Sequence, residues 1–407
     1  MEVLKNQTLI IKNFGPINIG SKKPLDFKRC TVFIGDQGSG KSTVVKVFST
    51  LTWLEKYITA KNNKAIKSIN EFKNLLSQQN IPKSYFNKDT YIEYNGQSLS
   101  VIIKDDNIKI SENIKESERY ICPKIQYFPA ERNLLSVISN IQTATGIPEM
   151  LNALNREFDI ACKEVKGIKF QDFLLMYYEQ SKEKTVFHTK TGSEVELLQA
   201  SSGLQSIYPL LFVSRYLKNT VDANFLERLK NSDDNRRQNV VRLISDPILK
   251  DKVYNYILSR IGNISNEDID SLNKDFSRII NSCLIEIVEE PEQNLFPISQ
   301  SELLKQLVTH TNGIGDKLII TTHSPYILSQ LNNSIFAYEK LYYSKSKLKK
   351  KFCELFIPFN DIAAYKIENG KINNILDKSF KGINVLEIDK CSRVISAEFE
   401  KINDESI

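Results

Sequence analysis

The feature that most constrains this chain is the stretch at residues 31–43, which reads Thr-Val-Phe-Ile-Gly-Asp-Gln-Gly-Ser-Gly-Lys-Ser-Thr. It begins as an apolar run typical of a buried strand, continues as a glycine-rich turn and passes into a helical pattern. Its glycines, lysine and serine fit G-x-x-x-x-G-K-[ST], the pattern of a phosphate-binding loop. The flanking apolar strand and helix are the context that such a loop needs, so the match predicts a nucleotide site.

The residue types in this stretch have a physical reason. Glycines let main-chain N–H groups converge on one point, and the helix that follows aims its unpaired N–H groups at the same point. Lys41 is expected to reach the β- and γ-phosphates, and the Ser42 hydroxyl to ligate Mg²⁺. The predicted contacts of a nucleoside triphosphate are Gly35, Asp36, Gln37, Gly38, Ser39, Gly40, Lys41, Ser42 and Thr43.

Bulk composition sets broad limits on the protein. The 407 residues are 41% hydrophobic and 26% charged, and the net charge of +6 permits contact with nucleic acid without arguing for it. No apolar run approaches the length of a membrane span, and the six cysteines are scattered without a Cys-x-x-Cys pair. We therefore expect a cytoplasmic protein with reduced cysteines, no zinc and no membrane contact.

Strand-like and helical segments alternate along the chain, which predicts an α/β fold with a mostly parallel central sheet. We expect strands at residues 8–12, 31–34, 108–110, 124–128, 282–288, 316–322, 334–338 and 362–367, and hairpins at 90–104 and 185–198. Helical patterns follow the loop, cover 133–180, 201–217 and 219–281, lead up to 312 and begin again near 389. Pro209 should distort the helix that contains it.

The expected organisation is a single head over residues 1–407, with no internal repeat. Three segments are expected as additions to this head. They are a polar insert with a β-hairpin at 60–120, a helical lobe at 133–184 and a helical insert at 218–280. C-terminal strands and a helix at 335–407 are expected to complete the core.

Two adjacent carboxylates, Glu289 and Glu290, follow an apolar strand that Pro291 brings to an end. Glu289 can hold Mg²⁺, and Glu290 can polarise the water that attacks a γ-phosphate. A solvated acidic turn is the alternative interpretation, and the pair alone leaves both open. The phosphate-binding loop far upstream favours the catalytic interpretation.

His323 directly follows another apolar strand, at the edge of a parallel sheet where phosphate-binding loops also lie. It is a candidate donor to the γ-phosphate, with a packed or capping histidine as the alternative. Ser324 and Pro325 predict that a helix starts immediately after it. His188 and His310 lack such neighbours, and we interpret them as surface or packing residues.

Ser201, Ser202 and Gly203 open a further helix and could form a second anion site from hydroxyl and N–H groups. One chain has no evident use for two sites that each hold one end of the same γ-phosphate. In a pair of chains, however, the serine turn of one can close the nucleotide held by the other. An ordinary serine N-cap is the alternative.

Taken in order, four motifs resemble the ABC-type ATPases of the RecF, SMC and OLD group, and specifically its stand-alone AAA_15/AAA_21 branch. They are the loop at 31–43, the serine-glycine turn at 201–203, Glu-Glu-Pro-Glu at 289–292 and Thr-His-Ser-Pro at 322–325. Phe-Gly-Pro-Ile at 14–17, Pro-Ala-Glu-Arg at 129–132 and the continuation of the acidic motif to 297 are similar to the same branch. The resemblance implies an ATPase head of ABC type that binds ATP and Mg²⁺.

The resemblance also implies roles for particular residues. The serine-glycine turn would be the signature motif, although it departs from Leu-Ser-Gly-Gly-Gln, and residues 295–297 would be the D-loop. Gln126 and Glu131 both remain candidates for the Q-loop residue. Phe14 is a candidate for stacking on adenine, with a core aromatic as the alternative.

Lys41, Glu290 and His323 would then act on the nucleotide held by their own chain. Two heads of this group sandwich two ATP molecules, so the resemblance implies a homodimer or higher homo-oligomer. The biological role that it implies is the ATPase of a bacterial anti-phage defence system, similar to those of the PARIS and Septu systems.

The segments around the motifs narrow this role. Residues 133–180 are too short and irregular for a long coiled-coil arm, and the tail after His323 lacks the acidic cluster of a TOPRIM nuclease. Any TOPRIM or HNH nuclease, or other toxin, is therefore expected on a separate effector chain. The alternative is a RecF-like DNA-repair or DNA-binding ATPase. A transporter subunit is disfavoured by the inserts and by the variant signature.

One basic run bears on DNA as a partner. Residues 345–351 read Lys-Ser-Lys-Leu-Lys-Lys-Lys, which is either a solvated loop or a contact with a phosphate backbone.

Overall fold

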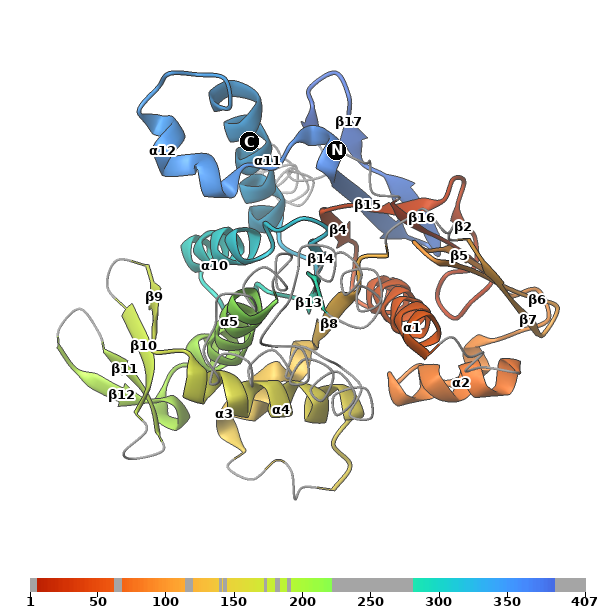
Figure 1. Cartoon of the computed structure of the whole chain (residues 1–407), viewed down its shortest axis with the longest axis horizontal. Helices are drawn as coiled ribbons and strands as arrows, with labels where there is room; N and C mark the ends of the chain where they lie inside the picture. The colour runs from red at the N-terminus through yellow and green to blue at the C-terminus, as the bar shows by residue number, and fades with distance from the viewer. Residues whose placement is uncertain are drawn as a thin grey trace, which may run out of the picture.

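The computed structural model describes residues 6–61, 68–113, 120–138, 141, 145–171, 174–179, 184–188, 192–221 and 281–384. A seven-stranded sheet in the order β2-β16-β15-β4-β14-β13-β8 lies at its centre (Figure 1). Five neighbours, β15, β4, β14, β13 and β8, run parallel, whereas β16 is antiparallel to β15. The strands are β2 (Gly20–Ser21), β4 (Cys30–Ile34), β8 (Pro123–Phe128), β13 (Cys283–Glu289), β14 (Lys317–Thr322), β15 (Ile362–Glu368) and β16 (Lys371–Asn374).

The central strands are mostly apolar and are buried because both faces of the sheet are covered. Every residue of β13 and β14 is buried. Along β13, Leu284 and Val288 pack into one hydrophobic core, whereas Ile285 and Ile287 pack into a second core on the opposite face. The expected α/β fold with a mostly parallel sheet is confirmed.

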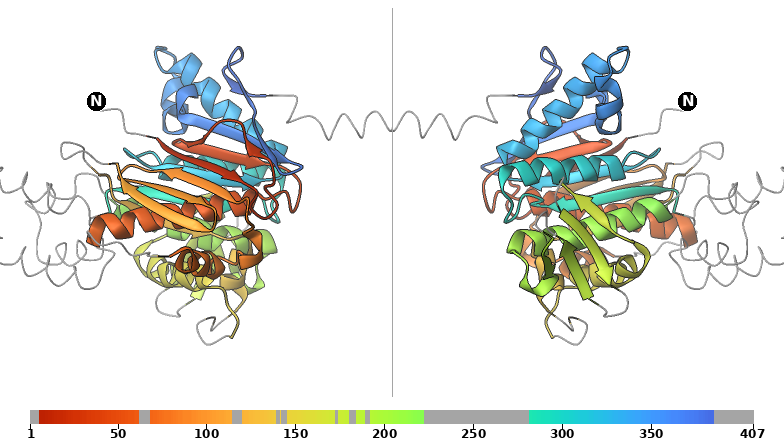
Figure 2. Two further views of the ribbon diagram at one scale, coloured as in Figure 1. Left: turned by 90° about the vertical axis from the view of Figure 1, so that its right-hand side faces the viewer. Right: turned by 90° about the vertical axis from the view of Figure 1, so that its left-hand side faces the viewer.

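The first face of the sheet carries α1 (Lys41–Lys61) and a five-stranded antiparallel sheet in the order β3-β1-β5-β6-β7 (Figure 2, left). Its strands are β1 (Gln7–Lys12), β3 (Leu25–Phe27), β5 (Tyr91–Asn95), β6 (Leu99–Lys104) and β7 (Asn107–Glu112), and α2 (Ile69–Gln78) packs beside them. Glu55 of α1 is fully buried and accepts hydrogen bonds from the Tyr94 hydroxyl at 2.6 Å and the Ser98 N–H at 2.5 Å. These bonds fix α1, and with it the loop that precedes it, against the antiparallel sheet.

The second face is covered by helices (Figure 2, right). They are α4 (Glu149–Glu164), α5 (Ser202–Thr220), α10 (Pro297–His310) and α11 (Pro325–Leu341). A four-stranded sheet in the order β12-β11-β10-β9 extends this layer, with strands β9 (Ile168–Phe170), β10 (Leu174–Glu179), β11 (Lys184–His188) and β12 (Glu194–Glu196). Short turns of helix, η2 (Ala130–Asn133), α3 (Leu134–Val137) and η4 (Leu197–Gln199), connect these parts.

Helix α5 continues through Pro209 without a break. Proline has no N–H to donate to the carbonyl four residues before it, which is that of Gln205. The Ser136 hydroxyl of α3 donates to this carbonyl oxygen at 2.6 Å. A side chain from a neighbouring segment therefore supplies the hydrogen bond that the proline removes.

Most of the expected elements are present, and two expectations were wrong. The helical pattern assigned to 133–180 ends with α4 at Glu164, and β9 and β10 follow it. The strand expected at 334–338 lies within α11, which begins at Pro325 as expected. The insert expected at 219–281 and the closing helix near 389 lie outside the described residues, apart from the ends of the insert. None of the helices in the described ranges combines the length and apolar composition that a membrane span needs.

Candidate nucleotide site

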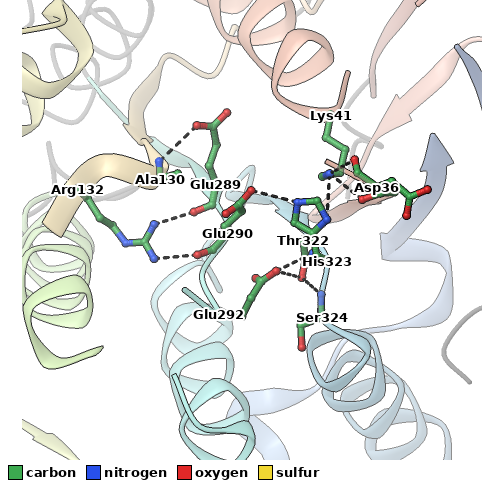
Figure 3. A network of polar contacts seen from close by, with 11 residues as sticks. Asp36, Lys41, Ala130, Arg132, Glu289, Glu290, Glu292, Thr322, His323 and Ser324 are labelled. Carbon is green, nitrogen blue, oxygen red and sulfur yellow. Dashed lines mark hydrogen bonds and ion pairs between the residues drawn. The ribbon is translucent and has the colours of Figure 1, made fainter. Parts of the chain in front are cut away.

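Three neighbouring parallel strands bring the predicted residues to one edge of the sheet. β14 lies between β4 and β13, and its register pairs Thr322 with Ile34 and Thr321 with Glu289. The residues that follow these strands are the glycine-rich loop, His323 and Glu290. They therefore come together at the carboxyl edge of the sheet, as Figure 3 shows for Lys41, His323 and Glu290.

The loop between β4 and α1 needs glycine for two separate reasons. Gly38 and Gly40 have φ angles of +71° and +103°, which other residues rarely adopt. A Cβ on Gly40 would also lie 2.6 Å from the side chain of Ile17. The tip of the loop, at Asp36, Gln37 and Gly38, is exposed to solvent, whereas Lys41 behind it is buried.

Lys41 is held over the loop by the loop itself. Its ammonium donates to the carbonyl oxygens of Gly35 at 2.8 Å and Asp36 at 2.9 Å, and Nζ lies 3.5 Å from Nδ1 of His323. An ammonium has three donors, so two are committed to these carbonyl oxygens and the third is within reach of the His323 ring. Burial lowers the pKa of Lys41, and the carboxylate of Glu290 opposes that shift.

Glu290 and His323 form a pair across the ends of β13 and β14. Nε2 of His323 lies 3.1 Å from Oε1 of Glu290. The hydrogen bond from His323 holds the pKa of Glu290 below its usual value. Glu290 has a φ angle of +43°, in the left-handed region that a side chain enters at a cost of about 1–3 kcal/mol. The surrounding contacts must therefore hold this carboxylate in place.

Glu292 fixes the main chain at His323. Its Oε1 accepts hydrogen bonds from the Thr322 hydroxyl at 2.8 Å and from the N–H of His323 at 2.6 Å (Figure 3). The Ser324 N–H in turn donates to the Thr322 hydroxyl at 2.9 Å, and the Ser324 hydroxyl caps α11 by accepting from Tyr326 N. Glu292 thus sets the direction in which the imidazole leaves the sheet.

Glu289 lies at the end of β13 on the α1 side and is held by two donors. The Tyr127 hydroxyl donates to its Oε1 at 2.7 Å, and the Ala130 N–H donates to its Oε2 at 3.4 Å. Glu289 is 5% exposed as a whole residue, and the two hydrogen bonds fix both carboxylate oxygens in direction. Burial and the neighbouring Glu289 raise the pKa of Tyr127 well above its usual value, which keeps the phenol protonated as the donor.

The side chain of Arg132 contacts the main chain at the same place, where β13 ends. Its guanidinium is fully buried and donates to the carbonyl oxygens of Glu289 at 2.7 Å and Glu290 at 3.0 Å (Figure 3). It also donates to the carbonyl oxygens of Pro129 and Ser206, each at 3.2 Å. All four of these hydrogen bonds from the Arg132 side chain therefore end on main-chain carbonyl oxygens.

The serine-glycine turn lies apart from the loop. Helix α5 packs in the core on the second face, whereas α1 packs in the core on the first face. Ser201 and Ser202 are exposed, and the Ser201 side chain makes no cap hydrogen bond although it occupies the N-cap position. A Cβ on Gly203 would lie 2.6 Å from the carbonyl oxygen of Asn294, so this turn packs closely on residues 294–295.

Phe14 is in a different position from the one that adenine stacking requires. Its side chain is 0% exposed and makes edge contacts with Tyr85, at 5.8 Å between ring centroids, and with Phe86, at 4.9 Å. No face of the ring is open to a base in this conformation, so the alternative of a core aromatic is the one that the structure supports. The two Q-loop candidates also differ, because Gln126 is buried and donates to the Tyr127 carbonyl whereas Glu131 is exposed.

The two remaining histidines have structural partners. His188 stacks on Tyr177 and lies 3.3 Å from Glu194 at the surface. His310 is buried, with Nδ1 at 2.8 Å from the Ser214 hydroxyl, which also donates to Glu286 at 3.0 Å. Neither is near the loop, in agreement with the expectation that they are surface or packing residues.

Sequence reasoning assigned no role to Tyr127, Arg132 or Glu292. Glu292 and Arg132 both stand inside quoted motifs, yet nothing in the spacing shows what they contact. Their partners are distant in sequence, since Arg132 is 157 residues from Glu289 and Glu292 is 31 residues from His323. Only the pairing of β8, β13 and β14 brings these ends together.

Comparisons with known proteins found structural similarity at low sequence identity and low TM-score. No protein-family model and no curated protein matches the chain. Among solved structures, the SMC head domain from Thermotoga maritima is 13% identical, with a TM-score of 0.33 over 91% of this chain and 98% of that one. The recombination mediator RecF bound to ATP is 11% identical, with a TM-score of 0.30 over 92% and 99%. A structure described as a metal-chelate type ABC transporter is 10% identical, with a TM-score of 0.30 over 94% and 89%. The functional argument therefore rests on the geometry of the site.

Proposed function

We propose that the chain is an ATPase head of ABC type that binds and hydrolyses ATP and works as a molecular switch. The observation that carries this proposal is the convergence of Lys41, Glu290 and His323 at one edge of the parallel sheet. Lys41 lies 3.5 Å from His323, which lies 3.1 Å from Glu290. A cation, a carboxylate with a lowered pKa and an imidazole are the groups that phosphoryl transfer to water uses.

Each group has a distinct task in this proposal. The loop N–H groups and the ammonium of Lys41 hold the phosphates, because an anion is stabilised at the start of a helix. Glu290 is ionised at neutral pH and accepts a hydrogen bond from the attacking water. His323 orients Glu290 and can donate to the terminal phosphate when its ring turns. Typical general-base contributions to rate are about 10²–10⁴-fold.

Ser42 and Glu289 are the residues that would hold Mg²⁺. A hydroxyl and a carboxylate are the hard oxygen donors that this ion prefers, and few protein ligands suffice because phosphate oxygens and water complete the shell. When bound, Mg²⁺ would neutralise charge on the β- and γ-phosphates.

The exposed serine turn supports a composite site made by two chains. Ser201 and Ser202 present uncommitted hydroxyls at a helix start, on the opposite side of the sheet from α1. Phe296 and Ile298 lie beside Asn294, on which Gly203 packs, and are 75% and 68% exposed. Large apolar side chains this exposed favour a surface that is covered by a partner. We therefore propose a head-to-head homodimer, or a higher homo-oligomer built from it.

The biological role proposed is the sensor or regulator ATPase of a bacterial anti-phage defence system. In this proposal the head is a switch that controls a separate nuclease or toxin effector. Its support is the resemblance of the four motifs, three of which meet at one edge of the sheet.

A Glu290→Gln variant tests the proposal. It keeps the hydrogen-bonding shape but removes the base, so it should bind ATP and lose at least about 100-fold in kcat. It should also accumulate as a dimer with ATP and Mg²⁺ in light scattering, whereas Glu149→Gln on the surface of α4 should match the wild type. Wild-type turnover in Glu290→Gln would refute the catalytic assignment. A monomer at all ATP concentrations would refute the two-head model.

A second candidate, a DNA-binding ATPase of RecF type, has one surface feature in its favour. Residues 338–354, around α12 (Leu348–Phe352), hold six lysines and two glutamates, a net +4 out of +6 for the whole chain. Tyr343 stands among them and is 90% exposed. Clustered lysines with an exposed aromatic ring are typical of surfaces that contact nucleic acid.

A further inference from the structure

Among the residues that the structure describes, the buried cation of Arg132 contacts no carboxylate directly. Its side chain is 0% exposed, and its four recorded hydrogen bonds end on the carbonyl oxygens of Pro129, Ser206, Glu289 and Glu290. A buried charge without a paired counter-ion is costly, so a chain that keeps one gains something specific from it. The guanidinium has five donors in a rigid plane and can join several chain segments at once, which no neutral side chain of similar size can do.

The first segment that it joins is the catalytic corner. β13 pairs with β8 as far as Val288 and with β14 as far as Glu289, so the carbonyl groups of Glu289 and Glu290 lie where the sheet hydrogen bonding stops. Buried carbonyl groups need a partner. Arg132 donates to the carbonyl oxygen on each side of the Glu290 Cα, beside the Gln293 N–H that also donates to the Glu290 oxygen, and so restrains the φ angle of +43° at Glu290.

The second segment is helix α5. Nε of Arg132 donates to the carbonyl oxygen of Ser206, one turn of helix after the serine-glycine turn at 201–203. Ser136, four residues after Arg132, donates to the neighbouring carbonyl of Gln205, which Pro209 leaves without its helical partner. Side chains of the short stretch from η2 to α3 therefore donate hydrogen bonds to two consecutive carbonyl groups of α5.

We propose that Arg132 is a positioning residue that couples the serine-glycine turn of α5 to the carboxylate of Glu290. It does not touch the nucleotide. It makes the start of α5 and the corner at Glu289–Glu290 move as one unit, so whatever binds at Ser201 and Ser202 alters the aim of the base. This inference rests on the proposed function, because it assigns Glu290 as the base.

The charge persists under the conditions of the reaction. Burial lowers the pKa of Arg132 to about 10, while Glu292, Glu289 and Glu290 oppose the shift, so the guanidinium stays protonated near neutral pH. The hydrogen bonds from Arg132 to both segments are therefore present near neutral pH and are not lost by deprotonation there.

The test compares Arg132→Lys with Ser214→Ala. Lysine keeps the charge but has one nitrogen and cannot reach both segments, so we expect kcat to fall about 10–100-fold, as for a misaimed catalytic group, with KM for ATP within about threefold of the wild type. Ser214 also joins α5 to β13, through Glu286, but touches neither carbonyl of the corner. Ser214→Ala should therefore lower stability and leave kcat close to the wild-type value.

Two outcomes would overturn the inference. One is a folded Arg132→Lys that binds ATP and turns over at the wild-type rate. The other is an equal loss of kcat in Ser214→Ala, which would show a general effect of loosening α5.

A second measurement needs no variant and no turnover. In the wild type, the hydrogen-bonded amides of Gln205 and of Glu290 should show the same free energy of opening, once each exchange rate is corrected for the intrinsic rate of that amide, and should respond equally to low urea, because one unit opens. Different free energies of opening for the two segments would refute the coupling, even where Arg132→Lys does not fold. If the wild type hydrolyses no ATP but these amides open together, the proposed function fails and the coupling stands.

Discussion

Nε2 of His323 lies 3.1 Å from Oε1 of Glu290, while Nδ1 of the same ring lies 3.5 Å from Nζ of Lys41. One imidazole thus connects the predicted base to the cation of the phosphate-binding loop. The connection has an electrostatic consequence, because the hydrogen bond from His323 is the largest cause of the lowered pKa of Glu290.

Replacing His323 by alanine should therefore change the pH profile as well as the rate. A carboxylate base acts only above its own pKa, so the acidic limb of kcat should move to higher pH when the hydrogen bond that lowers that pKa is lost. We expect kcat at neutral pH to fall about 10–100-fold, at the low end of general acid–base effects. Steady-state assays from pH 5 to 8 measure both. His188→Ala at the surface is the control, and an unmoved acidic limb in His323→Ala would contradict the pairing.

Removing the loop cation should abolish nucleotide binding. Lys41→Ala leaves the loop carbonyl oxygens of Gly35 and Asp36 without their donor and removes the charge that meets the phosphates. Charge-assisted contacts to phosphate are strong, and we expect ATP affinity to fall at least about 100-fold. Isothermal titration measures it, with Lys46→Ala, further along α1, as the matched control. Unchanged ATP affinity in Lys41→Ala would remove the site assignment.

The loop, Glu289, Glu290 and His323 were accessible from the sequence because each follows an apolar strand directly. In a parallel sheet such positions share one edge, so local patterns were enough to bring them together. The contacts of Arg132 and of Glu292 could not be predicted from the sequence, because both depend on which strands are neighbours in the sheet. Arg132 reaches Glu290 across 158 residues of sequence.

The errors in secondary structure have a different origin. Residues 174–178 read Leu-Leu-Met-Tyr-Tyr, and a short apolar run of this kind is compatible with both helix and strand. Pairing of β10 with β9 and β11 decides the matter, and no local signal carries that information. Likewise, Ile335 lies in an apolar run that resembles a strand, but the helix started by Ser324 and Pro325 continues through it. Phe14 could be read as a base-stacking or as a core aromatic until its neighbours Tyr85 and Phe86 were placed.

Glu292 should act through His323. Glu292→Ala removes the acceptor for the Thr322 hydroxyl and the His323 N–H, whereas Glu292→Gln keeps an oxygen in that place. A buried donor left without a partner costs about 1–3 kcal/mol, so Glu292→Ala should lower the free energy of unfolding by that amount and kcat about 10-fold. Glu292→Gln should recover most of both. Urea unfolding and steady-state kinetics check this, and equal kcat in the two variants would argue against a positioning role.

The buried pair Glu286 and His310 should shape the dependence of stability on pH. Burial raises the pKa of Glu286 to about 8, so the folded state keeps a proton that the unfolded chain loses above the usual carboxyl range, and stability falls as pH rises towards 8. Burial lowers the pKa of His310 to about 3, so its contribution rises with pH up to the usual histidine value. The two slopes oppose each other at pH 5–6, and Glu286 dominates between about pH 6.5 and 8.

Glu286→Gln should remove that decline. One group contributes at most about 1.4 kcal/mol per pH unit to the slope of stability against pH. The free energy of unfolding, measured in urea at pH 6.5 and 7.5, should therefore fall between these two pH values in the wild type, and it should fall less in the variant. The difference between the two falls should be of this order. Glu302→Gln, on the outer side of α10, is the control. Parallel pH curves for the wild type and Glu286→Gln would show that Glu286 is ionised in the folded protein.

The lysines around α12 decide between the two candidate functions. If this surface contacts DNA, exchanging Lys347 and Lys350 for glutamate should lower the affinity at least 10-fold and flatten the salt dependence, because each lost phosphate contact removes about one unit from the logarithmic slope. Lys349 is a poorer choice, since its ammonium donates to the Tyr342 carbonyl at the end of α11. Lys22→Glu with Lys23→Glu, at the exposed turn before β3, changes the net charge equally and is the matched control. Fluorescence anisotropy with a labelled duplex between 50 and 200 mM salt measures both quantities. Equal binding by the two double variants would mean that these lysines are solvated, and it would leave the separate-effector switch as the better account of the chain.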